Sequence, residues 1–184
     1  MWVFLKSASD KSNWLKHEQI EICFIGRSNV GKSTLINALA QNKVAHTSKT
    51  PGRTQLINYF DTQLGIIAVD LPGYGYAKMA KTKQMQMVYM VEEYFQLARP
   101  QIVFLLIDAR IGFQTQDEVV LKHLMSLKYN VNLIITKCDQ ANQKQLATTL
   151  KQPYFQTLPF FKMAQKNTKL IGVLQTYLAN LTKA

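Results

Sequence analysis

Phe24-Ile-Gly-Arg-Ser-Asn-Val-Gly-Lys-Ser-Thr34 is the stretch that decides the fold. An apolar run at residues 20–25 leads into Gly26, and a helix-forming run follows Ser33. The order strand, GxxxxGK(S/T) loop, helix is the context that confirms a phosphate-binding loop. Its glycines let successive backbone N–H groups point into one concavity, and the N-terminus of the following helix attracts anions. The sequence therefore predicts a nucleotide site at this loop.

Two side chains of the loop have chemistry that suits a nucleotide. Lys32 supplies a mobile positive charge for the outer phosphates, and the Ser33 hydroxyl is a candidate Mg²⁺ ligand. Every residue of the loop is a candidate contact for the nucleotide: Gly26, Arg27, Ser28, Asn29, Val30, Gly31, Lys32, Ser33 and Thr34.

The composition is that of a globular protein. The chain has 184 residues, 47% of them hydrophobic, which fits one domain spanning residues 1–184 with a substantial core. Its longest plainly apolar run, residues 102–107, is far too short to cross a bilayer, and residues 1–5 lack the features of a signal peptide. Cys23 and Cys138 are not spaced for a zinc site or a disulfide framework. We expect a cytoplasmic protein that does not enter a membrane.

Lysine and arginine outnumber aspartate and glutamate by 22 to 11, which gives a net charge of +11. A surface this basic accumulates near polyphosphate, and a nucleotide-binding domain of this size does not need such an excess. The lysines are spread along the chain, so the sequence does not localise the basic surface. We expect an RNA-rich partner; the plainer alternative is a basic surface that only keeps the protein soluble.

Apolar strand-like runs alternate with helix-like runs, which indicates an α/β fold with a largely parallel sheet. Strands are predicted at residues 3–5, 20–25, 55–60, 64–69, 102–107, 131–135 and, weakly, 154–160. Helices are predicted at residues 32–40, 84–97, 115–128, 143–151 and from about 170 to 181. The short connection at residues 61–63 requires an antiparallel pair, and residues 42–54 should form an irregular loop. Thr115 is predicted to open its helix with a capping box through Glu118.

A second candidate site follows the predicted strand 64–69. Asp70, Leu71, Pro72 and Gly73 come at its carboxyl end, which is the sheet edge where the first loop lies. A carboxylate there can hold Mg²⁺ through water, and the Gly73 N–H can reach a γ-phosphate. A plain turn uses the same residue types, but an aspartate directly after a core strand usually has a function.

The third candidate, Thr136-Lys-Cys-Asp139, follows the predicted strand 131–135 on the same edge of the sheet. An ionised aspartate accepts two parallel hydrogen bonds, and guanine offers that pair of donors from N1–H and N2–H₂. Adenine has no such pair and would leave the carboxylate unmatched. The methylenes of Lys137 can lie against the base plane. Thr136, Lys137, Cys138 and Asp139 are therefore candidate contacts, and the nucleotide is predicted to be GTP or GDP.

Four motifs together carry a family resemblance: GRSNVGKSTLINAL at 26–39, KTPGRTQLINYF at 49–60, DLPGYGYA at 70–77 and TKCD at 136–139. Over nearly its whole length the chain resembles the EngB/YsxC family of translation-factor-class bacterial GTPases. The resemblance implies a three-layer P-loop GTPase fold, a Ras-like G domain with helices on both faces of a mostly parallel sheet. It implies GTP or GDP, Mg²⁺ and the precursor of the large ribosomal subunit (rRNA and ribosomal proteins) as ligands and partner. A monomer that binds no DNA is expected, with a part in cell division and septation through ribosome supply.

The resemblance also assigns residues outside the three candidate sites described above. Thr54 is implied to be the switch threonine that ligates Mg²⁺ in the GTP state, within a segment that lines the nucleotide: Gly52, Arg53, Thr54, Gln55 and Leu56. The backbone of Phe160, Phe161 and Lys162 takes the place of the family's last base-contacting loop, although the usual serines are missing. A further family pattern, implied to be structural, is matched by Asp108, Arg110 and Asp117.

Tyr74 stands where Ras-type enzymes have the glutamine that orients the attacking water, so we expect slow hydrolysis. The catalytic group stays open, with Thr54, Gly73 and Asn29 as candidates. Asn29 resembles the residue through which some related GTPases hold K⁺, and Arg53 is a less favoured arginine finger.

Three other functions compete with this interpretation. A small-molecule kinase also uses a phosphate-binding loop, but TKCD and residues 52–54 would have no purpose there. A GTP-gated module that binds RNA or protein with negligible hydrolysis fits the same motifs. A membrane-associated GTPase would need a lipidation motif or a basic amphipathic tail, and neither is visible in the sequence.

Overall fold

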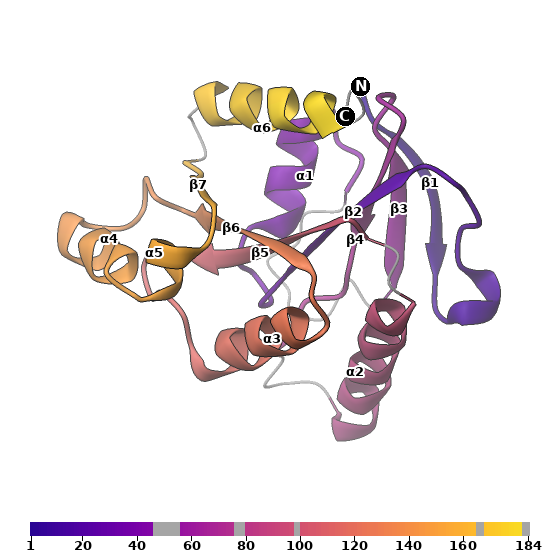
Figure 1. Cartoon of the computed structure of the whole chain (residues 1–184), viewed down its shortest axis with the longest axis horizontal. Helices are drawn as coiled ribbons and strands as arrows, with labels where there is room; N and C mark the ends of the chain where they lie inside the picture. Colours follow the sequence, from indigo (N-terminus) through magenta and orange to yellow (C-terminus); the bar gives the residue numbers. More distant parts are fainter. Residues whose placement is uncertain (46–55, 76–79, 98–99, 165–167, 182–184) are drawn as a thin grey trace.

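The described strands form one mixed sheet in the order β1-β3-β4-β2-β5-β6-β7 (Figure 1). The computed structural model describes residues 1–45, 56–75, 80–97, 100–164 and 168–181. The strands are β1 (Val3–Ala8), β2 (Ile20–Gly26), β3 (Ile57–Asp61), β4 (Ile66–Asp70), β5 (Ile102–Asp108), β6 (Asn130–Thr136) and β7 (Phe160–Lys162). β3 is antiparallel to β1 and β4, whereas every pair from β4 through β7 is parallel. This mostly parallel sheet confirms the predicted fold class.

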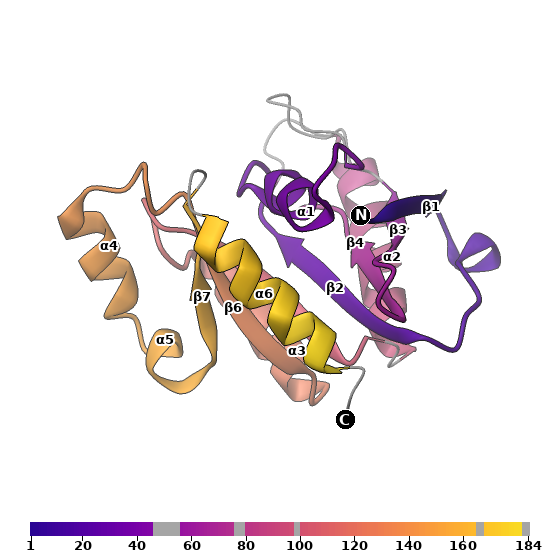
Figure 2. The same cartoon turned by 90° about the horizontal axis from the view of Figure 1, so that it is seen from above.

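Helices cover both faces of the sheet (Figures 1 and 2). On one face lie α1 (Lys32–Ala40) and α6 (Thr168–Leu181), and on the other lie α2 (Lys81–Gln96) and α3 (Thr115–Ser126). The remaining described helices are η1 (Lys11–Asn13), α4 (Gln143–Leu150) and α5 (Tyr154–Thr157). Both views place α4, α5 and β7 together at one end of the molecule.

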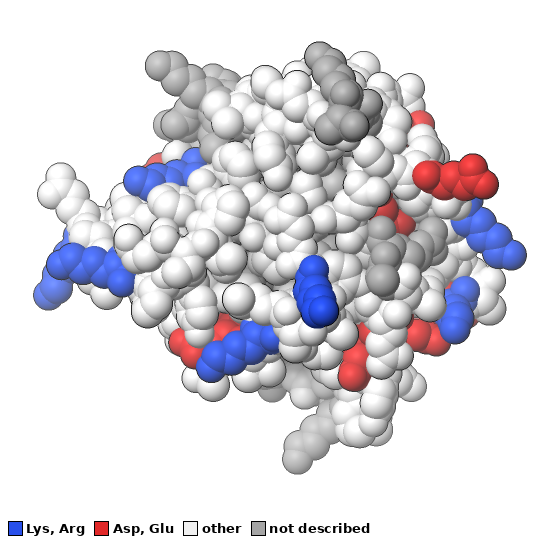
Figure 3. Space-filling view, viewed as in Figure 1, with Lys and Arg blue, Asp and Glu red and all other residues white. Residues whose placement is uncertain are grey.

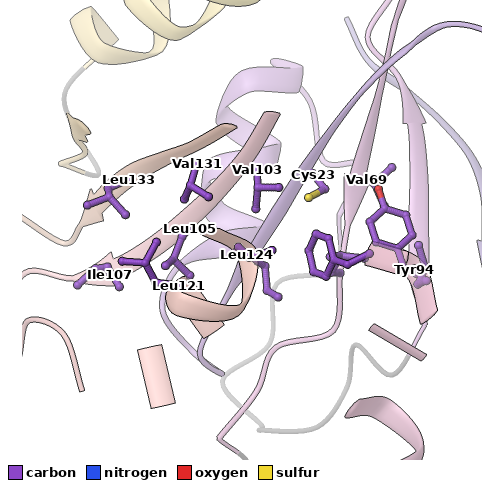
Figure 4. Packing of buried hydrophobic residues seen from close by; sticks show 14 of the residues in the cluster. Cys23, Val69, Tyr94, Val103, Leu105, Ile107, Leu121, Leu124, Val131 and Leu133 are labelled. Atoms are coloured by element: carbon purple, nitrogen blue, oxygen red, sulfur yellow. The ribbon is translucent and has the colours of Figure 1, made fainter. Parts of the chain in front are cut away.

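The central strands are apolar throughout because both of their faces are covered. Alternate residues of β5 serve the two cores, since side chains of a strand alternate between its faces. Val103 and Leu105 pack under α3 against Leu121 and Leu124, as Figure 4 shows. Phe104 faces the opposite core, which contains residues of α1 and α6. The strands that carry the candidate site are therefore held from both sides.

Helix α1 begins and ends at the residues expected from the sequence, Lys32 and Ala40. Gly31 precedes it with φ +109°, a conformation that favours glycine, and Gln41 closes it in the left-handed region with φ +57°. The helix therefore starts directly at the second glycine of the loop, which leaves its first backbone N–H groups at the sheet edge.

Two expectations are wrong in their local detail. The strand expected at 154–160 is replaced by α5, which follows Pro153, and by β7 from Phe160 onward. The fixed φ of a proline suits the first turn of a helix, and aromatic runs alone do not distinguish a strand from a helix.

Helix α3 is preceded by Gln114 as N-cap, because the N–H of Gln114 donates to the carboxylate of Asp117 at 2.9 Å. The capping partner is thus Asp117, one residue before the Glu118 that the sequence pattern suggested.

Candidate functional site

The phosphate-binding loop leaves β2 at Gly26, next to β5. Gly26 pairs with Leu106, and a Cβ at position 26 would lie 3.0 Å from the Leu106 carbonyl oxygen. Few real Cβ atoms approach another atom so closely, so glycine is the residue that lets the two strands meet here without a shift of the Leu106 backbone. Asn29 has φ +61° and is exposed at the outer turn of the loop. The loop conformation therefore depends on its glycines and on an asparagine, a residue that tolerates the left-handed region.

Lys32 and Asp70 form a buried ion pair at the centre of the site. The Lys32 ammonium group donates a hydrogen bond to Oδ1 of Asp70, and both side chains are largely buried, 7% and 2% exposed. β4 lies beside β2 and ends at Asp70, which brings the carboxylate to the loop. The pair satisfies both buried charges, and it places the lysine where a phosphate would compete with the carboxylate for it.

The oxygen donors near this pair suit Mg²⁺ in part. Ser33 and Thr34 are half-buried in the first turn of α1, and Asp70 ends the neighbouring strand. Hydroxyl and carboxylate oxygens are the hard ligands that Mg²⁺ takes, and phosphate oxygens and water complete its shell in nucleotide sites. Among the described residues no group of three or more His, Cys, Asp and Glu side chains could hold a metal alone. The residues present therefore fit a Mg²⁺ ion that binds together with a nucleotide.

Residues 71–74 cross directly over the phosphate-binding loop. The Leu71 N–H donates to the Phe24 carbonyl at 3.1 Å, and the Ser28 N–H donates to the Tyr74 carbonyl at 2.9 Å. A Cβ at Gly73 would lie 3.2 Å from the Ser28 nitrogen. Gly73 is therefore packed against the loop backbone, and Asp70 to Gly73 lie beside the phosphate-binding loop, at the end of β4.

Tyr74 is bonded to a buried aspartate on α3. Its hydroxyl donates to Oδ1 of Asp117 at 2.7 Å, and Arg27 Nε lies 3.1 Å from Oδ2 of the same carboxylate. Asp117 is wholly buried, and its desolvation raises the pKa of the carboxyl, although Tyr74, Gln114 and Arg27 act in the opposite direction. Burial also raises the pKa of the Tyr74 hydroxyl, so the tyrosine is the donor. The sequence did not predict this contact. The one feature that could have indicated it is an aspartate, Asp117, within a helix whose apolar face is buried.

Thr136 ends β6 and supports the phosphate-binding loop through a hydrogen bond. Its hydroxyl donates to the Val30 carbonyl at 2.6 Å, and its side chain lies at the distance of ordinary contact from a Cβ built on Gly31. A residue first interpreted only as part of a base-recognition motif is therefore a structural support of the loop. This role explains why a hydroxyl residue fits at the position.

Lys137 links the loop to the end of β5. It has φ +56°, and its ammonium group donates to the Asn29 carbonyl at 2.5 Å and to Asp108 at 2.9 Å. Burial raises the pKa of the Asp108 carboxyl, but the hydrogen bonds from Arg110 and Lys137 outweigh it and lower the pKa to about 2. Arg110 binds Asp108 through Nε and Nη2, at 2.9 and 2.7 Å. Asp108 and Arg110 therefore have the structural role that the family pattern implied.

The remaining residues predicted to contact the nucleotide lie farther from the phosphate-binding loop or outside the described residues. Cys138 is half-buried with its N–H donating to the Met163 carbonyl at 3.0 Å, and Asp139 is exposed beside it. Phe160, Phe161 and Lys162 form β7 itself, so the chain reaches the edge that bears the site only after Lys162. Gly52, Arg53, Thr54 and Gln55 lie outside the described residues, and Leu56 is exposed at the start of the hairpin.

The chain is similar to known GTP-binding proteins. Residues 21–137 match the family described as 50S ribosome-binding GTPase. A probable GTP-binding protein EngB of Metamycoplasma arthritidis is 54% identical over 146 residues, which cover 79% of this chain and 80% of the relative. Another, of Mesomycoplasma hyopneumoniae, is 40% identical over 179 residues, which cover 97% of this chain and 88% of the relative.

Solved structures share the fold. A crystal structure of a probable GTP-binding protein EngB superposes with a TM-score of 0.70 at 23% identity, covering 89% of this chain and 98% of that one. A variant of Era from Aquifex aeolicus bound to GDP and AlF₄⁻ gives 0.70 at 22% identity, covering 88% and 56%. No helix among the described residues is long and apolar enough to span a bilayer. From the family match and the curated relatives, the chain belongs to the EngB family of GTP-binding proteins, whose ligand is guanine nucleotide.

Proposed function

We propose that this protein is a slow, Mg²⁺-dependent GTPase that acts as a molecular switch in assembly of the large ribosomal subunit. The observation that carries the proposal is the meeting of three predicted segments on one sheet edge: residues 26–34, 70–73 and 136–139. The description of the matching family, 50S ribosome-binding GTPase, supports the choice of partner. A role in cell division would follow from ribosome supply.

Guanine specificity rests on the exposed carboxylate of Asp139. It follows β6 and the Thr136 support, so its backbone is held at a fixed place relative to the phosphate-binding loop. Two charge-assisted hydrogen bonds to N1–H and N2–H₂ would favour guanine over adenine.

Lys32 and the α1 N-terminus bind the phosphates, and Ser33 with Asp70, through water, holds the Mg²⁺. When bound there, Mg²⁺ neutralises charge on the phosphate oxygens. Lys32 would exchange its hydrogen bond with Asp70 for a phosphate oxygen, which frees the carboxylate to face the metal's water shell. Thr54 and Gly73 are the switch contacts that a γ-phosphate orders and hydrolysis releases.

Slow turnover is supported by the position of Tyr74. Its hydroxyl is bonded to Asp117, and a phenol cannot reproduce the donor and acceptor pair of a glutamine amide. Even Ras, which has that glutamine, turns over at only about 10⁻⁴ s⁻¹ without a partner's arginine. Asn29, exposed and close to the phosphates by its place in the loop, is the proposed K⁺ ligand.

Multiple-turnover phosphate release tests the enzymatic part. We expect slow but repeated turnover with Mg²⁺, loss of it with a chelator, and a higher rate in K⁺ than in Na⁺ at equal ionic strength. Equal rates in the two salts would eliminate the K⁺ ligand. Release that stops below one equivalent would favour the alternative, a GTP-gated binding module with negligible hydrolysis.

Sedimentation with large-subunit particles tests the partner. The net charge of +11 favours rRNA, and we expect co-migration that depends on a non-hydrolysable GTP analogue and weakens with salt. Co-migration that is equal with GDP, or absent with both nucleotides, would contradict the switch.

A further inference from the structure

The charges of the chain are distributed unevenly. All eleven acidic residues lie between positions 10 and 139, whereas residues 140–184 contain six lysines and no aspartate or glutamate. The described part of this acid-free segment includes α4, α5 and β7 at one end of the molecule. Figure 3 shows lysine or arginine side chains at the same end.

Helix α4 and its C-cap each present a lysine to solvent: Lys144 lies in the first turn of α4, and Lys151 directly follows its last residue. Lys144 and Lys151 are exposed and seven residues apart, a spacing that places them on the same side of a helix. The opposite side is anchored, because Thr149 is buried and its hydroxyl donates to the Ala109 carbonyl at 3.0 Å. The exposed residues close to the lysines are uncharged, and they include amide and hydroxyl groups that can bond to phosphate and sugar: Asn142, Gln143 and Thr148.

The position of α4 is fixed by the neighbouring loop. Gln152, just beyond Lys151, accepts a hydrogen bond from the Phe113 N–H at 2.8 Å. At the other end, Asn142 accepts from the Gln145 N–H at 2.8 Å as the helix cap. Two lysines on a held helix lose less conformational freedom on binding than lysines on a loose loop.

Strand β7 adds an aromatic group beside a third lysine. Phe160 and Lys162 are both exposed, and the Lys162 ammonium group lies 5.9 Å from the Phe160 ring centroid. An exposed ring next to positive charge is the combination on which unpaired bases stack. Asp108, at the end of β5, is already paired with Arg110 and Lys137.

We propose that the α4–β7 surface, defined by Lys144, Lys151, Phe160 and Lys162, is the part of this protein that docks on RNA. The inference rests on the proposed function for its source of RNA, the large-subunit precursor. Lysine is depleted at protein–protein interfaces, and the surface has a single exposed aromatic group in place of an apolar centre, so RNA fits it better than a protein does. The surface adjoins the Thr136–Asp139 segment, which connects it to the base side of the nucleotide site.

A charge-matched pair of variants tests the surface. K144Q/K151Q removes the lysine of α4 and the lysine of its C-cap, and K16Q/K83Q removes two exposed lysines before β2 and on α2. Both lower the net charge by the same amount, so a diffuse attraction would weaken equally in the two. The probe is a fluorescent RNA hairpin, a 20-base-pair duplex closed by an unpaired loop, titrated at several salt concentrations, with GDP affinity as the check that each variant is folded.

We expect K144Q/K151Q to bind the hairpin about tenfold more weakly at low salt and to reduce the slope of log K against log salt by about two, roughly one per lost phosphate contact. K16Q/K83Q should stay within about threefold of the wild type and retain its slope. Equal weakening in both variants, or none in K144Q/K151Q, would overturn the proposal.

Sedimentation of the same proteins with large-subunit particles separates this result from the proposed function. Wild-type protein that co-migrates while K144Q/K151Q binds the hairpin normally would reject the surface and leave the function standing. Wild-type protein that fails to co-migrate, with the hairpin result as expected, would reject the ribosomal partner and leave an RNA-binding surface.

Discussion

The hydrogen bond between Tyr74 and the buried Asp117 gives the most exact test of the structure. Tyr74→Phe removes a hydrogen bond from a hydroxyl to a wholly buried carboxylate, while Gln114 and Arg27 remain as partners. A hydrogen bond to a charged group contributes about 1.5–3 kcal/mol, and the lower end applies because two partners remain. Asp117→Ala leaves a part-buried hydroxyl and a guanidinium that is 21% exposed without this partner, and should cost about 3 kcal/mol, the lower end for a broken buried pair.

The assay is urea unfolding at pH 7, followed by circular dichroism, for both single variants and the double variant. Because the two side chains are in direct contact, their effects should not add, and we expect a coupling energy of about 1–2 kcal/mol. Tyr89→Phe is the matched control, since that tyrosine is 63% exposed on α2 and should change stability by less than about 0.5 kcal/mol. If Tyr74→Phe behaves like Tyr89→Phe and the coupling is near zero, the hydrogen bond does not hold this segment in solution.

Three further outcomes follow from contacts at the site. Because the folded pKa of Asp108 is lowered to about 2, its stabilisation is complete above its ordinary pKa and is lost as pH falls from about 4 to 2. Asp108→Asn should therefore lose less stability than wild type across that window, measured by urea unfolding; parallel pH profiles would contradict this. Gly26→Ala should cost about 1–3 kcal/mol and weaken GDP binding, because its Cβ would press on Leu106, and unchanged calorimetric affinity would refute the close approach. Thr136→Val keeps the volume but removes the hydrogen bond to Val30, so melting should show a loss of about 1 kcal/mol, which a silent substitution would disprove.

The sequence was sufficient wherever a local pattern determines the structure. The glycines of the loop and the apolar run before it predicted both β2 and the exact bounds of α1. The strand β5 was equally clear, because a short continuous apolar run bounded by polar residues is typical of a strand covered on both faces. The same local rules placed Asp70 and Asp139 at strand ends on one edge of the sheet.

Long-range polar contacts could not be predicted in the same way. Tyr74 and Asp117 are 43 positions apart, and Thr136 and Val30 are 106 apart, so only the fold shows that they meet. The strand predicted at residues 154–160 was wrong for a different reason. Its apolar residues fit both a helix and a strand, and the pairing of β7 with β6 decided between them.

The central claim is that residues 26–34, 70–73 and 136–139 form one guanine-nucleotide site. Its most direct test is titration calorimetry of GDP and ADP against the wild type, Asp139→Asn and, as control, Glu18→Gln, which removes an exposed carboxylate at the far end of β2. Asparagine keeps one acceptor oxygen and replaces the other with an NH₂ donor, so one hydrogen bond to a carboxylate is lost, which corresponds to about 1.5–3 kcal/mol. Asp139→Asn should therefore bind GDP about 10- to 100-fold more weakly. Glu18→Gln should match the wild type, and ADP should bind weakly to all three proteins. GDP binding that is unchanged in Asp139→Asn, or ADP binding as tight as GDP in the wild type, would contradict the claim.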